Sequence, residues 1–246
     1  MKRLINLCVL LLCSSLFAQT YIPKYVGEYK QQIVNEGAYT LCYLNDYELS
    51  VWVAYDLNPA QNVKRADCFR VDPKIVGGTA TPKDYLNTGF DKGHLAPCDD
   101  FCDSTEHMQN TFFMSNMSPQ YPNFNRIVWR MLEAKAKLIY AKYGNCYVVT
   151  GPVLNAPPDK YMRIGTSVKT VVPRFFYKIY FAKDSDSYHA WAFIIENMTS
   201  KQQVDDFSKY QRTVRNIEQL TGIDFFTELP QETQEKVETS IEKVNF

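Results

Sequence analysis

Short runs of β-branched and aromatic residues form the most regular hydrophobic pattern in the chain. Residues 38–57 are rich in Tyr, Val, Leu and Trp around an Asn-Asp pair, which predicts a β-hairpin. Residues 145–154, 174–182 and 188–195 have a similar composition and predict three further strands, the last two paired with each other. The glycines and prolines between residues 58 and 90 predict irregular connections.

Three segments have a helical period instead. Between residues 123 and 143, apolar positions recur at helical spacing with charged positions between them, and Gly144 predicts the end of this helix. Residues 201–222 show a second amphipathic pattern that also ends at a glycine, and residues 231–244 predict a short C-terminal helix. Antiparallel strands mixed with packed helices predict an α+β fold, with a central antiparallel sheet and flanking helices.

The N-terminal segment differs from the rest of the chain. Two basic residues (2–3) precede an apolar run (4–12) that is too short to span a bilayer, and Ala18 offers a cleavage point. This order favours a secretory signal peptide over an apolar core helix. We therefore expect residues 1–19 to be a signal peptide, residues 20–246 to form a single domain, and the protein to be secreted or periplasmic.

Cysteine usage and charge narrow the class of protein. A lipid anchor on Cys13 is disfavoured because the preceding leucines lack the small residue of such a signal, and no later stretch reaches the length of a membrane span. Five cysteines follow the leader, enough for two disulfides and a spare thiol in an exported protein. The 27 basic residues, of which the leader holds two, balance 27 acidic ones. A near-neutral chain excludes a grossly basic nucleic-acid binder but allows a local basic groove.

One of the three histidines, His94, ends the stretch DKGH and is the first candidate for chemistry. Asn125 and Glu133 follow on the predicted helix, ~12 Å apart and rotated by about 80°, so they cannot easily both touch one small ion. Mg²⁺ keeps several waters, so Asn125 can bind it directly and Glu133 through a water. Spacing alone favours simpler roles, with Asn125 as an N-cap or first-turn residue and Glu133 paired with Lys137.

Taken together, the motifs resemble a known family. The segments that carry the resemblance are TGFDKGHLAP, SNMSPQ and NFNRIVWRMLE, supported by WVAYDL, RADCFRVDP and LTGIDFFTELP. They are similar to the DNA/RNA non-specific endonucleases, ββα-metal nucleases that include secreted bacterial sugar-non-specific enzymes and mitochondrial endonuclease G. The family motif is D-R-G-H, with an Asn about thirty residues later and a Glu eight beyond it. The same order and spacings occur here in His94, Asn116, Asn125 and Glu133. The resemblance as a whole covers roughly residues 38–245.

The resemblance implies hydrolysis of phosphodiester bonds in DNA and RNA with one hydrated Mg²⁺, for which Mn²⁺ or another divalent ion is the alternative. His94 is similar to the family's general base, and an unperturbed imidazole with a pKa of ~6.5 suits that role. Asn125 is similar to the metal ligand, and Glu133 to the residue that anchors metal-bound waters. Asp91 and Asn116 are expected to hold the turn and the histidine in place.

The resemblance also assigns contacts to phosphate. The family's phosphate-binding arginine matches Arg65 or Arg70, of which we favour Arg65. Lys92 stands where the family has arginine, which keeps the charge but loses bidentate geometry. Further basic residues on the predicted helix are expected to follow the phosphate backbone, although a solvated helix face explains them as simply; they are Arg126, Arg130, Lys135 and Lys137. Because dimers are common in the family, a homodimer is a further expectation.

Two alternatives use the same part of the chain. His94, Cys98, Cys102 and His107 lie within fourteen residues and can be interpreted as a zinc cluster, but structural zinc pairs usually flank a longer loop and exported cysteines tend to oxidise. A local Cys98–Cys102 disulfide is a second option for those cysteines. The other alternative is a non-catalytic nucleic-acid-binding or zinc-binding extracellular protein on the same fold. The joint presence of His94, Asn125 and Glu133 argues against it.

Overall fold

The computed structural model describes residues 21–185, 187–200, 204 and 206–243. The predicted signal peptide, residues 1–19, lies outside these ranges. Among the described residues, no helix combines the length and apolar character needed to cross a membrane.

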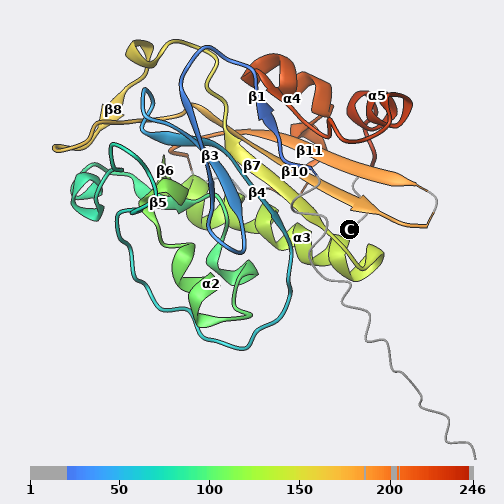
Figure 1. The fold of residues 1–246 in the computed structure, drawn as a ribbon, viewed down its shortest axis with the longest axis horizontal. Coiled ribbons are helices and arrows are strands. Elements are labelled where there is room, and N and C mark those ends of the chain that lie inside the picture. Colours follow the sequence, from blue (N-terminus) through green and yellow to red (C-terminus); the bar gives the residue numbers. More distant parts are fainter. Residues whose placement is uncertain (1–20, 186, 201–203, 205, 244–246) are drawn as a thin grey trace, which may run out of the picture.

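The described residues build a central sheet of seven strands, every neighbouring pair of which is antiparallel (Figure 1). In spatial order the strands are β12 (Gln211–Arg212), β11 (Tyr188–Glu196), β10 (Phe175–Lys183), β7 (Tyr147–Pro152), β4 (Leu49–Asp56), β3 (Thr40–Leu44) and β2 (Gln31–Asn35). The predicted hairpin at residues 38–57 is confirmed as β3–β4, and the predicted pairing of residues 174–182 with 188–195 is confirmed as β10–β11.

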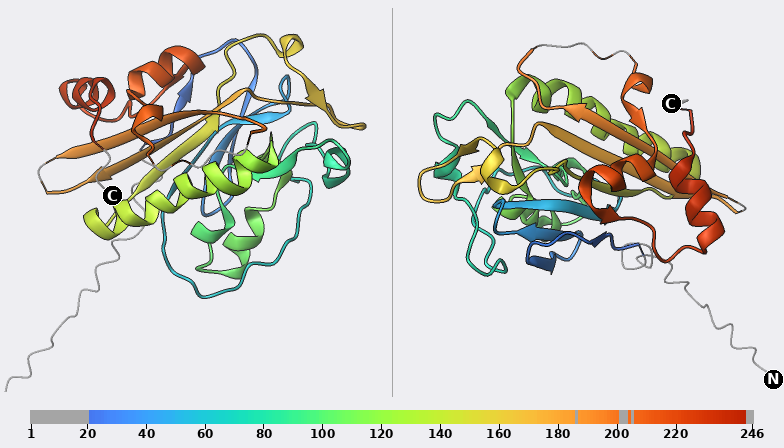
Figure 2. Two further views of the ribbon diagram at one scale, coloured as in Figure 1. Left: turned by 180° about the vertical axis from the view of Figure 1, so that it is seen from behind. Right: turned by 90° about the horizontal axis from the view of Figure 1, so that it is seen from above.

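Both faces of the sheet are covered, so the predicted α+β class is confirmed. Helix α3 (Arg130–Tyr143) lies across one face, and α4 (Val214–Thr221) and α5 (Gln231–Thr239) cover the other (Figure 2). Alternation along β10 separates two cores: Phe176 and Tyr180 pack on the α3 side, whereas Tyr177 and Ile179 pack on the α4–α5 side.

A smaller unit at one side of the sheet carries the candidate chemistry. Strand β5 (Asp91–His94) pairs antiparallel with β6 (Met117–Gln120), with the short helix α2 (Thr105–Asn110) between them in sequence. After β6 the chain enters a π-helical stretch, Phe124–Trp129, that continues directly into α3. The order strand, strand, helix is therefore the ββα arrangement that the sequence predicts. The helix ends where predicted, at Gly144, whose φ of 74° is in the left-handed region that favours glycine.

The remaining elements are short. Two further strand pairs join β1 (Lys24–Tyr25) to β13 (Ile223–Asp224) and β8 (Arg163–Ile164) to β9 (Thr170–Val171). Single 3₁₀ turns occupy Pro82–Tyr85, Cys98–Asp100, Met114–Asn116, Pro158–Lys160 and Ser208–Tyr210.

The prediction of a helix over residues 201–222 is wrong for its first part. Residues 201–203 and 205 lie outside the described ranges, and α4 begins only at Val214. Gln211 and Arg212 pair with β11 instead, and the Thr213 hydroxyl caps the helix by accepting a hydrogen bond from the Asn216 amide at 3.1 Å. Gln211 and Arg212 thus form an edge strand of the sheet, although their local sequence pattern is helical.

The C-terminal helix is shorter than expected, and the described cysteines are unpaired. Helix α5 ends at Thr239, where Ser240 becomes extended, rather than continuing to Val244. The five cysteines in the described ranges are free thiols, so the disulfides that their number allows are not formed. Cys42 and Cys146 are buried in the cores on opposite faces of the sheet, which prevents them from meeting. The Cys102 thiol donates to the Cys98 carbonyl at 3.4 Å instead of bonding the Cys98 sulfur.

Candidate active site

His94 is the last residue of β5, and its ring lies between two aromatic side chains. The ring centroids are 5.7 Å from Phe69 and 5.0 Å from Phe112, with the Phe112 contact edge-on at 89°. Nε2 is buried and has no hydrogen-bond partner among the described residues, although the residue as a whole keeps some exposure. Nδ1 is therefore the ring nitrogen that can meet a water molecule or a substrate.

The electrostatic setting of His94 differs from the expected unperturbed imidazole. Burial lowers the pKa of His94 to about 3, and the positive charges of Arg65 and Lys92 act in the same direction, opposed by Asp67. The ring is therefore neutral at pH 7 and able to accept a proton. The sequence could not show this shift because its largest cause is burial and because the fold brings Arg65 to the ring; of the charges involved, only Lys92 is close to His94 in the sequence.

The main chain around His94 is held from two sides. The Trp129 indole Nε1 donates to the His94 carbonyl at 3.3 Å, which ties β5 to the helix. Asn116 is fully buried and bonds both the N–H and the C=O of Ala96 at 2.9 Å, while its amide also donates to the Thr111 carbonyl at 2.8 Å. Asn116 therefore ties the residues that follow His94 to the end of the α2 segment.

Asp91, at the other end of β5, contacts the helix directly. Its Oδ2 accepts a hydrogen bond from Asn125 Nδ2 at 3.0 Å, and its two oxygens form a bidentate ion pair with the Arg126 guanidinium at 2.8 and 2.6 Å. Burial alone would raise the pKa of Asp91, but the hydrogen bonds from Arg126 and Asn125 lower it. The Asp91 carboxylate is therefore ionised. Because it accepts from Asn125 Nδ2, it holds the nitrogen of that amide toward itself and the oxygen away.

Because Asn125 Nδ2 is turned to Asp91, the amide oxygen is the end free to bind a cation. Asn125 is the second residue of the π-helical stretch, which follows Asn123, so it is the first-turn residue, not the N-cap, of the two positions that spacing alone favours. A carbonyl oxygen next to an ionised carboxylate suits a hard divalent ion. The donor set at this position therefore fits the expected metal.

Glu133 lies one turn after Trp129 on the same side of the helix. Burial raises the pKa of Glu133 to about 8; Lys178 acts against this shift, and Asp100 adds to it. The alternative pairing with Lys137 is not made, because the Lys137 ammonium donates to the Asp99 carbonyl at 3.3 Å. Glu133 is thus a half-buried carboxylate that a nearby cation would stabilise in its ionised form.

The two candidate phosphate-binding arginines have different surroundings. Arg65 is 47% exposed, lies over the Phe112 ring at 5.3 Å, and bonds Asp67 through Nε at 2.9 Å. Arg70 instead donates to loop carbonyls, including that of Gln109 at 2.7 Å, and stacks on Phe113. Since Phe112 also contacts His94, the geometry favours Arg65 beside the histidine and gives Arg70 a structural use.

The other basic residues predicted to contact the substrate also differ in their surroundings. The Lys92 ammonium lies 4.7 Å from the centroid of Phe69, the ring that also contacts His94. Arg130 and Lys137 are exposed on α3. Arg126 is exposed but engaged by Asp91, so its guanidinium can reach a phosphate only by giving up that ion pair.

Sequence reasoning missed two residues of this region, Trp129 and Lys178. In the sequence, Trp129 cannot be distinguished from the other apolar positions of the helix, and nothing connects it to His94. Lys178 offers a signal: it is a single charge in the centre of the apolar strand RFFYKIYFA.

The zinc interpretation is wrong for the four residues that it needs. Within the described chain, the ligand atoms that lie close enough together include those of Cys98, Asp99 and Cys102, but of neither histidine. His107 bonds Asp103 at 2.7 Å through Nδ1, as expected of an ordinary polar histidine. His94 points to Phe69 and Phe112 instead.

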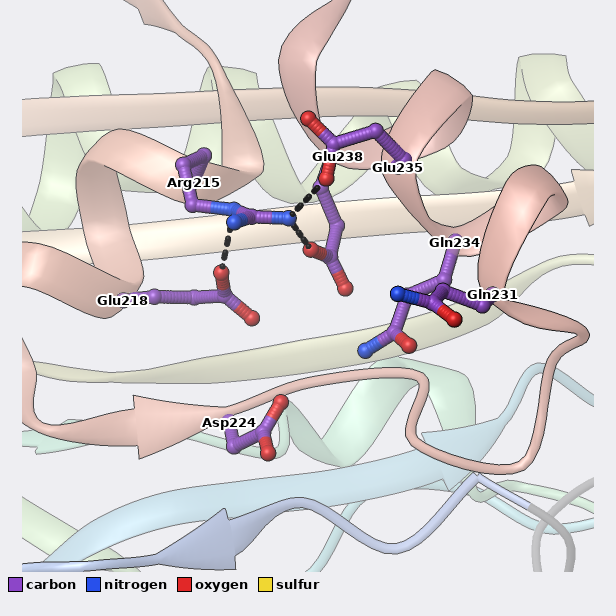
Figure 3. A pocket seen from close by; sticks show the side chains of 7 residues that line it. All are labelled: Arg215, Glu218, Asp224, Gln231, Gln234, Glu235 and Glu238. Atoms are coloured by element: carbon purple, nitrogen blue, oxygen red, sulfur yellow. Dashed lines mark hydrogen bonds and ion pairs between the residues drawn. The ribbon is translucent and has the colours of Figure 1, made fainter.

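A cleft of about 260 Å³ lies between α4 and α5, on the face of the sheet opposite α3. Figure 3 shows Arg215 reaching in among the acidic side chains that line it. Its guanidinium contacts Glu218 at 3.1 Å, Glu235 at 2.8 Å and Glu238 at 2.6 Å. This cleft is an ion-pair network that joins the two helices, and it is separate from the candidate active site.

Comparison with known proteins decides the family. The model of the DNA/RNA non-specific endonuclease family matches residues 18–232. The chain belongs to this family. Members of the DNA/RNA non-specific endonucleases are divalent-metal-dependent nucleases, in agreement with the donor set of Asn125 and Glu133.

Similarity to individual nucleases supports this family membership. The chain is 31% identical over 223 residues to a nuclease of Nostoc sp., covering 84% of this chain and 77% of the relative. It is 33% identical over 160 residues to mitochondrial endonuclease G of Homo sapiens, covering 60% of this chain and 54% of that protein. A chain in the crystal structure of the EndoG/EndoGI complex superposes with a TM-score of 0.73 at 27% identity, covering 85% of this chain and 91% of that one.

Proposed function

We propose that this protein is an exported, Mg²⁺-dependent endonuclease that hydrolyses phosphodiester bonds of DNA and RNA without strong sequence specificity. The family supports the reaction class. The observation that carries the assignment of residues is the Asp91–Asn125 hydrogen bond, which places the strand ending in His94 against the helix that bears Asn125 and Glu133. A base and a metal-ligand oxygen thus belong to one rigid unit.

His94 acts as the general base in this proposal. A water oxygen forms a bond to phosphorus while its proton passes to Nδ1 of the neutral imidazole. The bond from phosphorus to the 3′ oxygen breaks, and that oxygen takes up a proton from solvent. The burial that enforces neutrality also weakens the base, and the negative phosphate offsets this by stabilising the imidazolium that forms.

Asn125 would hold the metal ion through its amide oxygen, with Glu133 bound to it through a water. When bound, the ion supplies positive charge beside the phosphate and the leaving oxygen. Mg²⁺ is the proposed ion because a site with one neutral amide oxygen and one carboxylate acting through water suits a cation that keeps most of its hydration shell. Mn²⁺ or another divalent ion is the alternative.

Basic side chains around the histidine would bind the substrate. Arg65 and Lys92 flank the ring, and Arg130 and Lys137 continue along the exposed side of α3. Exposed cations of this kind bind phosphates without reading bases, which supports action on both DNA and RNA.

The leader and the family support two further parts of the proposal. Residues 1–19 have the order of a secretory signal peptide, so the enzyme would be secreted or periplasmic, which fractionation of the producing cells tests. A homodimer is proposed from the family resemblance, and light scattering of the purified protein tests it.

The central experiment is digestion of supercoiled plasmid and of RNA by the purified protein. We expect cleavage with Mg²⁺, loss of cleavage with EDTA, and at least a hundredfold loss in His94→Ala. His107→Ala is the matched control, since this histidine binds Asp103 away from the site. Cleavage that persists in EDTA or in His94→Ala would falsify the mechanism. Binding of nucleic acid without any cleavage would favour the non-catalytic alternative.

A further inference from the structure

Two adjacent phenylalanines, Phe112 and Phe113, follow helix α2, and each has an arginine over its ring. The Arg65 guanidinium lies 5.3 Å from the centroid of the Phe112 ring, and the Arg70 guanidinium lies 4.1 Å from the centroid of the Phe113 ring. A guanidinium in such a position is attracted by the negative charge density on the face of the ring. The same type of pair thus occurs twice, at consecutive residues.

The Arg70 side chain is held by other groups besides its ring. Its guanidinium donates to the Gln109 carbonyl at 2.7 Å and to the side-chain oxygen of Asn110 at 3.2 Å. These hydrogen bonds fix Arg70 to the end of α2 independently of Phe113. The pair of Arg70 and Phe113 is therefore a structural contact.

The Arg65 side chain is held much less firmly. Among the described residues, its one hydrogen bond runs from Nε to Asp67 at 2.9 Å, in a pair whose side chains are 47% and 63% exposed. An exposed ion pair of this kind orients a long side chain only weakly. The ring of Phe112 is therefore the one rigid group, among the described contacts of Arg65, that can fix where its guanidinium lies.

Phe112 itself has a well-defined position. It is fully buried, and its backbone carbonyl accepts a hydrogen bond from the Arg70 N–H at 3.2 Å. Its ring belongs to a small hydrophobic cluster with Cys98, Cys102 and Met108. Because close-packed side chains keep one arrangement, a group that lies against this ring has a defined place.

The same ring also contacts the proposed general base. The centroids of Phe112 and the His94 imidazole are 5.0 Å apart, and the two planes are nearly perpendicular, at 89°. One buried ring thus touches both His94 and Arg65. A cation that binds the phosphate must keep its place relative to the base, because the rate of an enzymatic reaction depends on the relative position of the reacting groups.

We propose that Phe112 is a positioning residue that holds the Arg65 guanidinium beside His94, in place to bind the phosphate group that is cleaved. The inference rests on the proposed function, because it assigns Phe112 to the same site. Phe112 acts through Arg65 and does not touch the substrate.

The decisive experiment is a double-mutant cycle between Phe112→Leu and Arg65→Gln. Leucine keeps an apolar side chain in the cluster and removes the aromatic face. We expect kcat/KM on plasmid DNA to fall about tenfold in Arg65→Gln and about three- to tenfold in Phe112→Leu. The double variant should lose no more than about twofold beyond Arg65→Gln alone, because the ring acts through the arginine. Losses that multiply would overturn the proposal, since Phe112 would then act independently of Arg65.

The salt dependence of cleavage is a second readout, which a packing defect alone does not move. Loss of one phosphate contact lowers the slope of log kcat/KM against log salt concentration by about one. We expect this change in Arg65→Gln and a smaller change of the same sign in Phe112→Leu. An unchanged slope in Phe112→Leu would count against the proposed role and overturn it.

Phe113→Leu is the matched control, because it removes the same type of ring from Arg70. It should lower the urea midpoint and leave the salt slope unchanged. If Phe113→Leu lowers the slope as much as Phe112→Leu does, the effect is not specific to the ring under Arg65, and the proposal fails.

The outcomes separate this inference from the proposed function. A wild type without metal-dependent cleavage overturns both. An active wild type with independent losses in the cycle overturns only the role of Phe112. If Phe112→Leu does not fold, the same cycle with Phe112→Met decides, and failure of both variants to fold makes the ring a structural residue and overturns the proposal.

Discussion

The Asp91 carboxylate accepts a hydrogen bond from the Asn125 amide at 3.0 Å, across the junction between β5 and the helix. The bond fixes the rotation of an amide whose two ends are nearly equal in shape but opposite in chemistry. It directs the oxygen, the only end that can bind a cation, away from Asp91. Orientation by a neighbouring acceptor is thus the main contribution of Asp91.

Asp91→Ala should therefore weaken metal binding without abolishing it. We expect the apparent Mg²⁺ affinity to fall by about 10–100-fold, the usual effect of removing a group that orients a ligand, and kcat to recover in part at saturating Mg²⁺. Titration of cleavage rate against Mg²⁺ measures both. Arg126→Ala is the control, since it removes the ion pair but keeps the Asp91–Asn125 bond, and an equal loss in that variant would contradict the interpretation.

The low pKa of His94 predicts activity in mild acid. The base must be unprotonated, and because its pKa in the folded protein is about 3, activity should be lost only as the pH falls toward that value. With an unperturbed pKa of ~6.5, kcat/KM would fall about 25-fold between pH 7 and pH 5. We expect a fall of less than about threefold over this range. A fall in kcat/KM centred near pH 6.5 that mutation of other titratable residues does not remove would contradict the structure.

Arg65 and Arg70 should respond differently to removal. Arg65→Ala should raise KM or lower kcat/KM by about tenfold, with an unchanged melting temperature, because the side chain is half exposed beside the histidine. Arg70→Ala should lower the free energy of unfolding by about 1–3 kcal/mol, because loop carbonyls lose a charged donor. Steady-state kinetics and urea unfolding of both variants make the comparison, and reversed effects would exchange their roles.

Gly93 in the motif DKGH is required by close packing. A Cβ at this position would collide with the Gln120 side chain of the paired strand β6. Gly93→Ala should therefore lower the free energy of unfolding by about 1–3 kcal/mol and shift His94, with a loss of activity. Adding Gln120→Ala should restore most of the stability, since it removes the colliding atoms. An unaltered Gly93→Ala protein would show that the strands adjust freely.

Much of this fold follows from local patterns. The strands now seen as β3, β4, β7, β10 and β11 are dense in β-formers, and Gly144 ends the long helix because only glycine enters the left-handed region easily. The start of α4 could not be predicted in the same way. Gln211 and Arg212 have a helical local pattern, but the open edge of β11 offers them backbone hydrogen bonds, and these prevail.

By itself, the sequence determined the family and the residues to consider, because D-K-G-H with Asn125 and Glu133 at fixed spacings is a pattern of residue types. Only the tertiary structure decided what surrounds them. The low pKa of His94, the orientation of the Asn125 amide and the position of Lys178 beneath Trp129 all depend on contacts between residues that lie far apart in the sequence. Burial and hydrogen bonding are properties of the folded environment, and a linear spacing does not contain them.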